Sequence, residues 1–149
     1  MILGIGVDVL HVPRLQRLVR LRPERFLTRI LTKVEQSEFR QQLREMELTT
    51  GQAEAAVTSP PPVKTVVPKA IESDASIRYL ATRWALKEAT YKALYPRHKL
   101  VWQDVTVYKK DGKPGLLIHG QENLGIASSH ASVSHDGEYV FAQVVLESR

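Results

Sequence analysis

The chain has 149 residues, of which 43% are hydrophobic and 25% are charged, and it contains no cysteine. A chain of this length and composition is expected to fold as one domain with a packed core, so global disorder is excluded. The lack of cysteine excludes disulfides, a thiol nucleophile and cysteine-ligated metal sites, and no apolar run approaches the roughly 20 residues of a membrane span.

Positive charge is concentrated in the first quarter of the chain. The net charge is +5; residues 1–33 contain seven basic and two acidic residues, whereas residues 34–149 contain fourteen of each sign. This asymmetry indicates an anionic partner near the N-terminus, which can be nucleic acid, an acidic protein or a membrane surface. The alternative is a solvated basic helix that binds no partner.

Residues 2–9 alternate between two faces and predict a strand with one buried face. The apolar face consists of Leu3, Ile5, Val7 and Val9. On the other face, Gly4 and Gly6 precede Asp8. Two glycines on one face allow another backbone or a ligand to approach closely.

Helices are predicted next. Pro13 and Pro23 each suit the first position of a helix, and residues 32–35 form a capping-box pattern that begins a third helix. Periodicity then fails over about 47–72, where four of the eight prolines lie, so we expect a Pro-rich loop insertion there.

A long helix and a set of strands follow the insertion. Ser73 or Asp74 caps a helix that runs to about Leu94. Strands are predicted over 101–109, 115–119, 129–134 and 138–147, with turns at Asp111-Gly112 and Asp136-Gly137. The predicted class is α+β, as a single domain over residues 1–149 with an antiparallel sheet packed on the long helix.

Glu88 is a carboxylate in a row that should be apolar, because it follows Trp84 by four residues and precedes Tyr91 by three. A half-buried carboxylate is costly unless a positive group compensates it. Lys92, one turn later, can provide that compensation for purely structural reasons. Alternatively, Glu88 is a metal ligand or general base, with Lys87 and Lys92 near enough to hold phosphate.

Asp8 is either a turn carboxylate ahead of Pro13 or a second metal ligand. The five histidines show no i, i+4 pair, so a zinc site has little support. Two carboxylates suit Mg²⁺, which takes few protein oxygens and completes its shell with water and phosphate.

Residues 134–136 read Ser-His-Asp but do not form a catalytic triad, because neighbouring side chains on a strand point to opposite faces. They are either an ordinary hairpin entry or the end of a strand beside a phosphate. Lys113-Pro114 has the same two interpretations, and no Walker-type loop or GxGxxG motif is present.

Several of these motifs, taken together and in order, resemble the 4'-phosphopantetheinyl transferases, and within them the short holo-acyl-carrier-protein synthase group. The resemblance is carried by Gly4-Ile5-Gly6-Val7-Asp8, Arg25 to Thr32, Arg83-Trp84-Ala85-Leu86-Lys87-Glu88-Ala89 with Lys92, Gly112-Lys113-Pro114 and Val133-Ser134-His135-Asp136. It implies the family's fold and an enzyme that transfers phosphopantetheine from coenzyme A to a serine of apo-acyl carrier protein, releasing 3',5'-ADP.

The resemblance also implies residue roles. Asp8 and Glu88 hold Mg²⁺, with Mn²⁺ as an alternative; Glu88 activates the serine, and Lys92 stabilises the leaving phosphate. Coenzyme A is expected to contact Arg83, Lys87, Lys92, Lys113, Pro114, Ser134 and His135. The acidic carrier protein is expected to dock on Arg14, Arg25 and Phe26, with Arg17 added from its place one turn after Arg14.

Short members of the family form homotrimers with the active site between protomers, so we expect the same here. Trp84 and the Ser-His-Asp motif look more like eukaryotic members, which suggests a mitochondrial enzyme, with the cytoplasm as the alternative. Residues 95–99 replace the glycine-rich loop of many members, so basic side chains are expected to substitute for backbone amides there.

A second hypothesis comes from a different class of protein. A basic α+β module that binds RNA or an acidic protein, without catalysis, would explain the charge of residues 1–33. It leaves Asp8 and Glu88 unexplained, and with aromatic residues at only 7% the chain lacks the stacking platform of a single-strand binder. Coenzyme A binding that depends on Mg²⁺ distinguishes the two hypotheses.

Overall fold

The computed structural model describes residues 1–49 and 69–148. Its elements are β1 (Ile2–His11), α1 (Val12–Leu21), α2 (Pro23–Ile30), α3 (Lys33–Thr49), the 3₁₀ helix η2 (Lys69–Glu72), α4 (Asp74–Leu94), the 3₁₀ helix η3 (Trp102–Asp104), β2 (Val105–Lys110), β3 (Lys113–Ile118), β4 (Ser128–Asp136) and β5 (Tyr139–Glu147). The predicted class, with helices early and antiparallel strands late, is confirmed.

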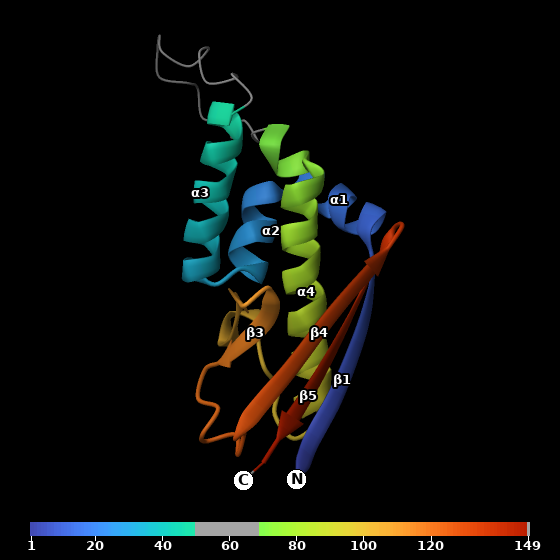
Figure 1. The fold of residues 1–149 in the computed structure, drawn as a ribbon, viewed down its shortest axis with the longest axis vertical. Helices are drawn as coiled ribbons and strands as arrows, with labels where there is room; N and C mark the ends of the chain where they lie inside the picture. Colours follow the sequence, from blue (N-terminus) through green and yellow to red (C-terminus); the bar gives the residue numbers. More distant parts are fainter. Residues whose placement is uncertain (50–68, 149) are drawn as a thin grey trace.

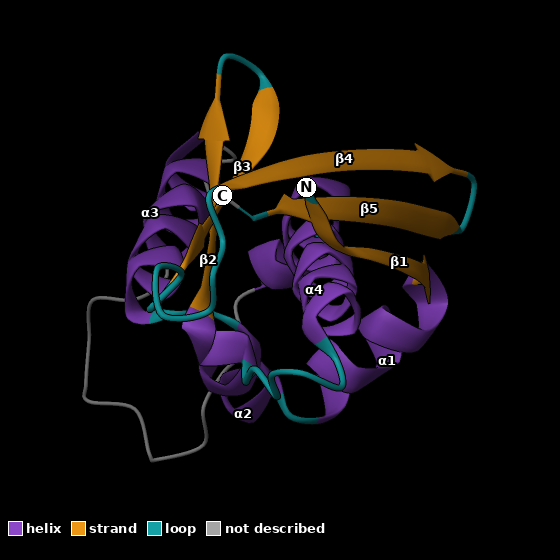
Figure 2. Ribbon diagram, turned by 90° about the horizontal axis from the view of Figure 1, so that it is seen from below, coloured by secondary structure: helices purple, strands orange, loops and turns teal. Residues whose placement is uncertain are grey.

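The long helix α4 is the centre of the fold (Figure 1). An antiparallel sheet in the order β1-β5-β4 lies along one side of it, and β2 and β3 form a separate hairpin (Figure 2). Helices α1, α2 and α3 gather around the N-terminal half of α4 (Figure 1). In the described part of the chain, no helix is both long enough and apolar enough to cross a bilayer.

The prediction for the two faces of β1 was wrong in one respect. Gly4 and Gly6 face α4, and a Cβ at either position would lie 1.8 Å from a backbone oxygen, that of Ala93 or Ala89. The apolar side chains Ile5, Val7 and Val9 are instead 54%, 40% and 59% exposed. The close approach of another backbone was expected from the glycines, and this contact decides which face is buried.

The helix-start predictions are confirmed by hydrogen bonds. The Ser73 hydroxyl accepts from the Ser76 amide at the start of α4. At the start of α3, the Thr32 amide donates to Glu35 Oε2 over 2.7 Å, and the Glu35 amide points back at the Thr32 hydroxyl over 3.4 Å. These two reciprocal contacts form the predicted capping box.

The predicted insertion and first late strand differ from the structure at their ends. Residues 50–68 of the insertion lie outside the described residues, whereas 47–49 belong to α3 and 69–72 to η2. The strand expected over 101–109 begins only at Val105, because the Asp104 carboxylate accepts from the Val101 amide over 2.8 Å and closes a turn. This turn forms η3.

Both predicted hairpin turns are present. Asp111 and Gly112 have φ angles of 51° and 80°, and Gly137 has a φ of 51°. On β5, alternate residues face α4 and are buried: Val140, Ala142, Val144 and Leu146. This is the face predicted from the sequence.

Candidate active site

Asp8 and Lys92 form an ion pair between β1 and α4. The Lys92 ammonium donates to Asp8 Oδ1 over 2.8 Å and to the Val7 carbonyl over 3.0 Å. The Asp8 side chain is 12% exposed, whereas that of Lys92 is 47% exposed. Asp8 is therefore a strand residue facing the helix, and the alternative of a turn carboxylate ahead of Pro13 is not supported.

Glu88 has no hydrogen bond or ion pair to any residue that the structure describes. Its half-buried side chain lines a cavity of about 440 Å³ between α2, α4 and residues 100–103. Lys92, proposed as its structural partner, is bound to Asp8 instead. Since Glu88 and Lys92 are one turn apart, the two carboxylates lie on the same side of α4.

These two carboxylates fit a hard divalent cation. Glu88 is an uncompensated oxygen donor facing a cavity, and Asp8 is held nearby through Lys92. Among residues 1–49 and 69–148, no cluster of three or more histidine or acidic side chains could enclose a metal. A two-carboxylate site that leaves positions open for water and substrate oxygens is the arrangement that Mg²⁺ accepts.

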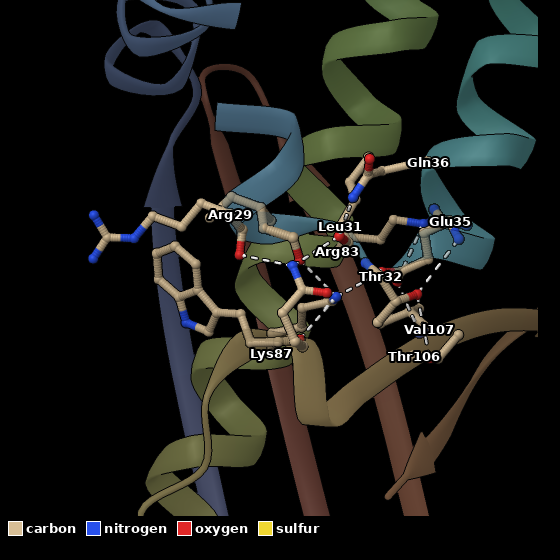
Figure 3. A network of polar contacts seen from close by, with 12 residues as sticks. Arg29, Leu31, Thr32, Glu35, Gln36, Arg83, Lys87, Thr106 and Val107 are labelled. Atoms are coloured by element: carbon tan, nitrogen blue, oxygen red, sulfur yellow. Dashed lines mark hydrogen bonds and ion pairs between the residues drawn. The ribbon is translucent and has the colours of Figure 1, made fainter. Parts of the chain in front are cut away.

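Figure 3 shows a buried ionic network around Glu35 and Lys87. Glu35 is fully buried, and its Oε2 atom accepts from Lys87 Nζ over 2.6 Å while its Oε1 atom accepts from the Val107 amide over 2.9 Å. Lys87 also donates to the carbonyls of Ile30, over 2.7 Å, and Trp102, over 3.1 Å. Burial lowers the pKa of the Lys87 ammonium, and the charge of Glu35 opposes that shift.

Lys87, one of the residues expected to contact coenzyme A, has no free donor in this geometry. An ammonium has three donors, and all three are used by Ile30, Glu35 and Trp102. The side chain has no exposed surface. In a helix, consecutive residues are separated by about 100°, so Lys87 faces the core although Glu88 faces a cavity.

A second cavity gathers three of the residues predicted to bind coenzyme A. Its volume is about 620 Å³, and its walls include Arg83, Pro114 and His135. Arg78 and Lys109 add further positive charge to the same walls. A cavity with this lining suits a phosphorylated ligand.

Arg83 is the most buried cation of this second cavity. Its guanidinium lies over the Tyr79 ring at 3.3 Å and is 3.7 Å from the carboxylates of Glu35 and Glu38. Burial lowers its pKa, and those negative groups oppose the shift. Its Nε atom is buried without a hydrogen-bond acceptor.

The two remaining candidates lie near this cavity but not in its walls. Lys113 is exposed at the start of β3, beside Pro114. Ser134 is exposed and pairs with Phe141 on the outer face of the sheet, whereas its neighbour His135 lines the cavity. Residues 134–136 therefore do not form a Ser-His-Asp triad, because the side chains of Ser134 and His135 diverge.

The two cavities lie on different sides of α4. Arg83 and Glu88 are five residues apart, which on an α-helix separates them by about 140°. The two cavities share no lining residue. A single chain thus carries the basic cavity on one side of α4 and the cavity lined by Glu88 on another.

A third hollow lies between α1, α2 and α4, with a volume of about 300 Å³. Phe26 forms part of its floor, 8% exposed and stacked on Trp84 at 5.3 Å. Arg22 and Arg25 line the same groove. The predicted docking residues Arg14, Arg17 and Arg25 are exposed and form no ion pair with the described residues.

Comparison with known proteins decides the family. A family model described as the 4'-phosphopantetheinyl transferase superfamily matches residues 4–144. The chain belongs to the 4'-phosphopantetheinyl transferase superfamily. The holo-[acyl-carrier-protein] synthase of Anaeromyxobacter dehalogenans is 32% identical over 155 residues, covering 99% of this chain and 97% of the relative. That of Oceanobacillus iheyensis is 30% identical over 151 residues, covering 100% and 99%.

Solved structures of similar proteins have the same fold. The holo-[acyl-carrier-protein] synthase of Neisseria meningitidis matches with a TM-score of 0.71 at 26% identity, over 99% of each chain. The enzyme of Bacillus anthracis, solved in complex with CoA (3',5'-ADP), matches with a TM-score of 0.67 at 26% identity, over 100% and 99%. The resemblance drawn from the motifs and the transferase fold are both confirmed, and the chain is an enzyme of this type.

Some side-chain contacts around these cavities were not predicted from the sequence. Glu35 was recognised only as a helix cap, because nothing local shows that its carboxylate also reaches Lys87. Gln103 lies in a segment predicted as a strand, and its amide contacts α2 instead. Tyr79 gave no signal beyond its aromatic ring. The contacts of Glu35 and Gln103 join segments far apart in sequence, whereas Tyr79 contacts Arg83 one turn later on the same helix.

Proposed function

We propose that this chain transfers 4'-phosphopantetheine from coenzyme A to a serine hydroxyl of apo-acyl carrier protein and releases 3',5'-ADP. The observation that carries the proposal is the unpaired Glu88 carboxylate, which faces a cavity one helical turn from the Asp8–Lys92 pair. Relatives at 30–32% identity along almost the whole chain are holo-[acyl-carrier-protein] synthases. Both lines of support favour the same reaction.

The chemistry follows from the charges of these side chains. The serine oxygen forms a bond to the phosphorus that carries pantetheine, and the bond from that phosphorus to the oxygen of 3',5'-ADP breaks. Glu88 is placed to take the serine proton. Lys92 uses two of its three donors on Val7 and Asp8 and exposes the third for the leaving phosphate.

A divalent metal belongs to this scheme. Asp8 and Glu88 would hold Mg²⁺, with Mn²⁺ as the alternative. When bound, such an ion neutralises phosphate charge in a reaction that depends more on positioning and charge than on covalent help. The nucleotide end of coenzyme A is assigned to the basic cavity of Arg83 and His135.

The separation of the two cavities supports a site shared between chains. Arg83 and Glu88 face different sides of α4, so the two ends of one coenzyme A molecule need surfaces from two protomers. The exposed Ile5, Val7 and Val9 on β1 supply an apolar face for such an assembly. We propose a homotrimer in which the cavity lined by His135 in one protomer adjoins the Asp8 and Glu88 carboxylates of the next.

The carrier protein is assigned to the arginine-rich groove, the hollow lined by Arg22, Arg25 and Arg29, together with the exposed Arg14 on the adjoining helix α1. Arg14→Glu is expected to raise the KM for the carrier roughly tenfold, because charge reversal replaces an attraction to an acidic partner with a repulsion. The KM for coenzyme A should not change. Added salt should reduce the difference in the KM for the carrier between Arg14→Glu and the wild-type enzyme. Steady-state kinetics with each substrate varied separately measures this.

The control for Arg14→Glu is Arg44→Glu, which makes the same change in net charge on α3. Arg44 is exposed and lies away from the groove. An equal loss of affinity for both substrates in Arg14→Glu, or an equal effect of Arg44→Glu on the carrier, would count against a docking site at Arg14.

The direct test of the proposed function is intact-protein mass spectrometry of apo-acyl carrier protein. The carrier is incubated with this chain, coenzyme A and Mg²⁺, and a parallel reaction contains EDTA. A gain of one phosphopantetheine group that EDTA suppresses is the expected result. No gain with several carriers, while the chain is folded, would favour the non-catalytic binding module. Parallel tests with a mitochondrial and a bacterial carrier address the predicted mitochondrial location.

A further inference from the structure

We propose that Gln103 is a positioning residue for this transfer, fixing the wall of the Glu88 cavity through its bonds to α2. The inference rests on the proposed function. Gln103 is exposed, and its Nε2 atom donates to the carbonyls of Thr28, over 2.7 Å, and Leu31, over 2.9 Å. It also lies 3.3 Å from the Arg29 carbonyl.

These carbonyls belong to the C-terminal end of α2, whose last carbonyls have no partner within the helix. Gln103 binds them from the exposed side. From the buried side, the Lys87 ammonium binds Ile30 and Trp102, the second of which belongs to η3 (Figure 3). The two side chains therefore fasten η3 to the end of α2 from opposite sides.

The fastened segments are the walls of the Glu88 cavity. Thr28 and Arg29 come from α2, and residues 100–103 come from the segment that ends in η3. Glu88 and Tyr91 on α4 complete the lining. The distance from Glu88 to the opposite wall is thus set by the contacts that Gln103 and Lys87 make.

The same wall separates the cavity from the arginine-rich groove. Arg29 and Trp102 line both hollows, and the Arg29 guanidinium lies over the Trp102 ring at 5.4 Å. A serine on a carrier protein seated in the groove reaches Glu88 past these two side chains. By holding the backbones of both, Gln103 governs the approach of the acceptor rather than the binding of coenzyme A.

The test is Gln103→Met, which keeps the length of the side chain and removes its donor. We expect kcat to fall about tenfold, because a small misplacement of a reacting group costs up to about 100-fold in rate. The KM for coenzyme A and the thermal midpoint of unfolding should stay at the wild-type values. The matched control is Gln41→Met on α3, an exposed glutamine whose amide binds only Glu45 among the described residues.

The outcomes separate the inference from the function on which it rests. Inactivity of the wild-type enzyme with apo-acyl carrier protein would overturn the proposed function. An active wild type together with a Gln103→Met kcat within twofold of it would overturn the positioning role alone. A lower kcat accompanied by a higher KM for coenzyme A and a lower unfolding midpoint would also overturn it, since that pattern reports general loosening of the fold.

Discussion

Glu88→Gln is expected to reduce transfer by about a thousandfold or more, which lies within the contribution of a positioned general base, while leaving the fold intact. Glutamine keeps the shape of the side chain but loses the charge of a metal ligand and the basicity needed to accept a serine proton. Glu88 has no partner among the described residues, so its neutralisation breaks no contact there. The rate is measured by mass spectrometry of the carrier, and folding by circular dichroism.

The matched control is Glu122→Gln. Glu122 is exposed in the connection between β3 and β4, and its substitution makes the same change in charge without reaching either cavity. Wild-type turnover by Glu88→Gln would exclude Glu88 both as a metal ligand and as the base. Equal losses in both variants would trace the effect to net charge rather than to the site.

The Glu88 variant also tests whether the site is shared between chains. His135→Asp places a negative charge in the basic cavity and is expected to be inactive for a different reason. Co-expression of Glu88→Gln with His135→Asp should restore part of the activity, because some mixed interfaces combine an intact Glu88 with an intact His135. No restoration in demonstrably mixed assemblies would mean that each chain holds a complete site.

The sequence was a good guide wherever the signal was local. Glu88 could be found because a carboxylate in an apolar helical row is anomalous within a single turn. The close contact on the Asp8 face of β1 could be predicted from the two glycines on that face. The helix caps at Thr32 and Ser73 could be predicted from neighbouring residues. These features depend on spacings of two to four residues, which a sequence displays directly.

The errors arose where burial is decided by segments far apart in the chain. The Val and Ile face of β1 would normally be buried, but α4 lies so close to the backbone that only the glycine face fits against it. Lys87 was expected to contact coenzyme A because it matches a family position that lines the coenzyme A site, and the sequence did not show that its side chain is buried. Its actual partner, Glu35, is 52 residues away, and no local pattern connects the two.

Lys87→Met is expected to destabilise the protein by about 3–5 kcal/mol, because it removes the nearest counter-charge of the buried Glu35 carboxylate and leaves only Arg83, at 3.7 Å, as a cationic partner. Typical domains have a free energy of unfolding of about 5–15 kcal/mol, so this loss is a large fraction of the total stability. Three hydrogen bonds that join α2, α3 and η3 to α4 are lost at the same time. Urea unfolding followed by circular dichroism measures the change.

Two further variants isolate the cause. Lys33→Met removes an exposed lysine at the start of α3 and should change stability by less than about 0.5 kcal/mol. Adding Glu35→Gln to Lys87→Met should recover part of the loss, since a neutral amide costs less to bury than an unpaired carboxylate. If the losses of unfolding free energy were strictly additive in the double variant, the two side chains would act independently. Recovery would instead mean that the loss of the Lys87 counter-charge causes the instability, so this lysine of the Lys-Glu motif serves the fold.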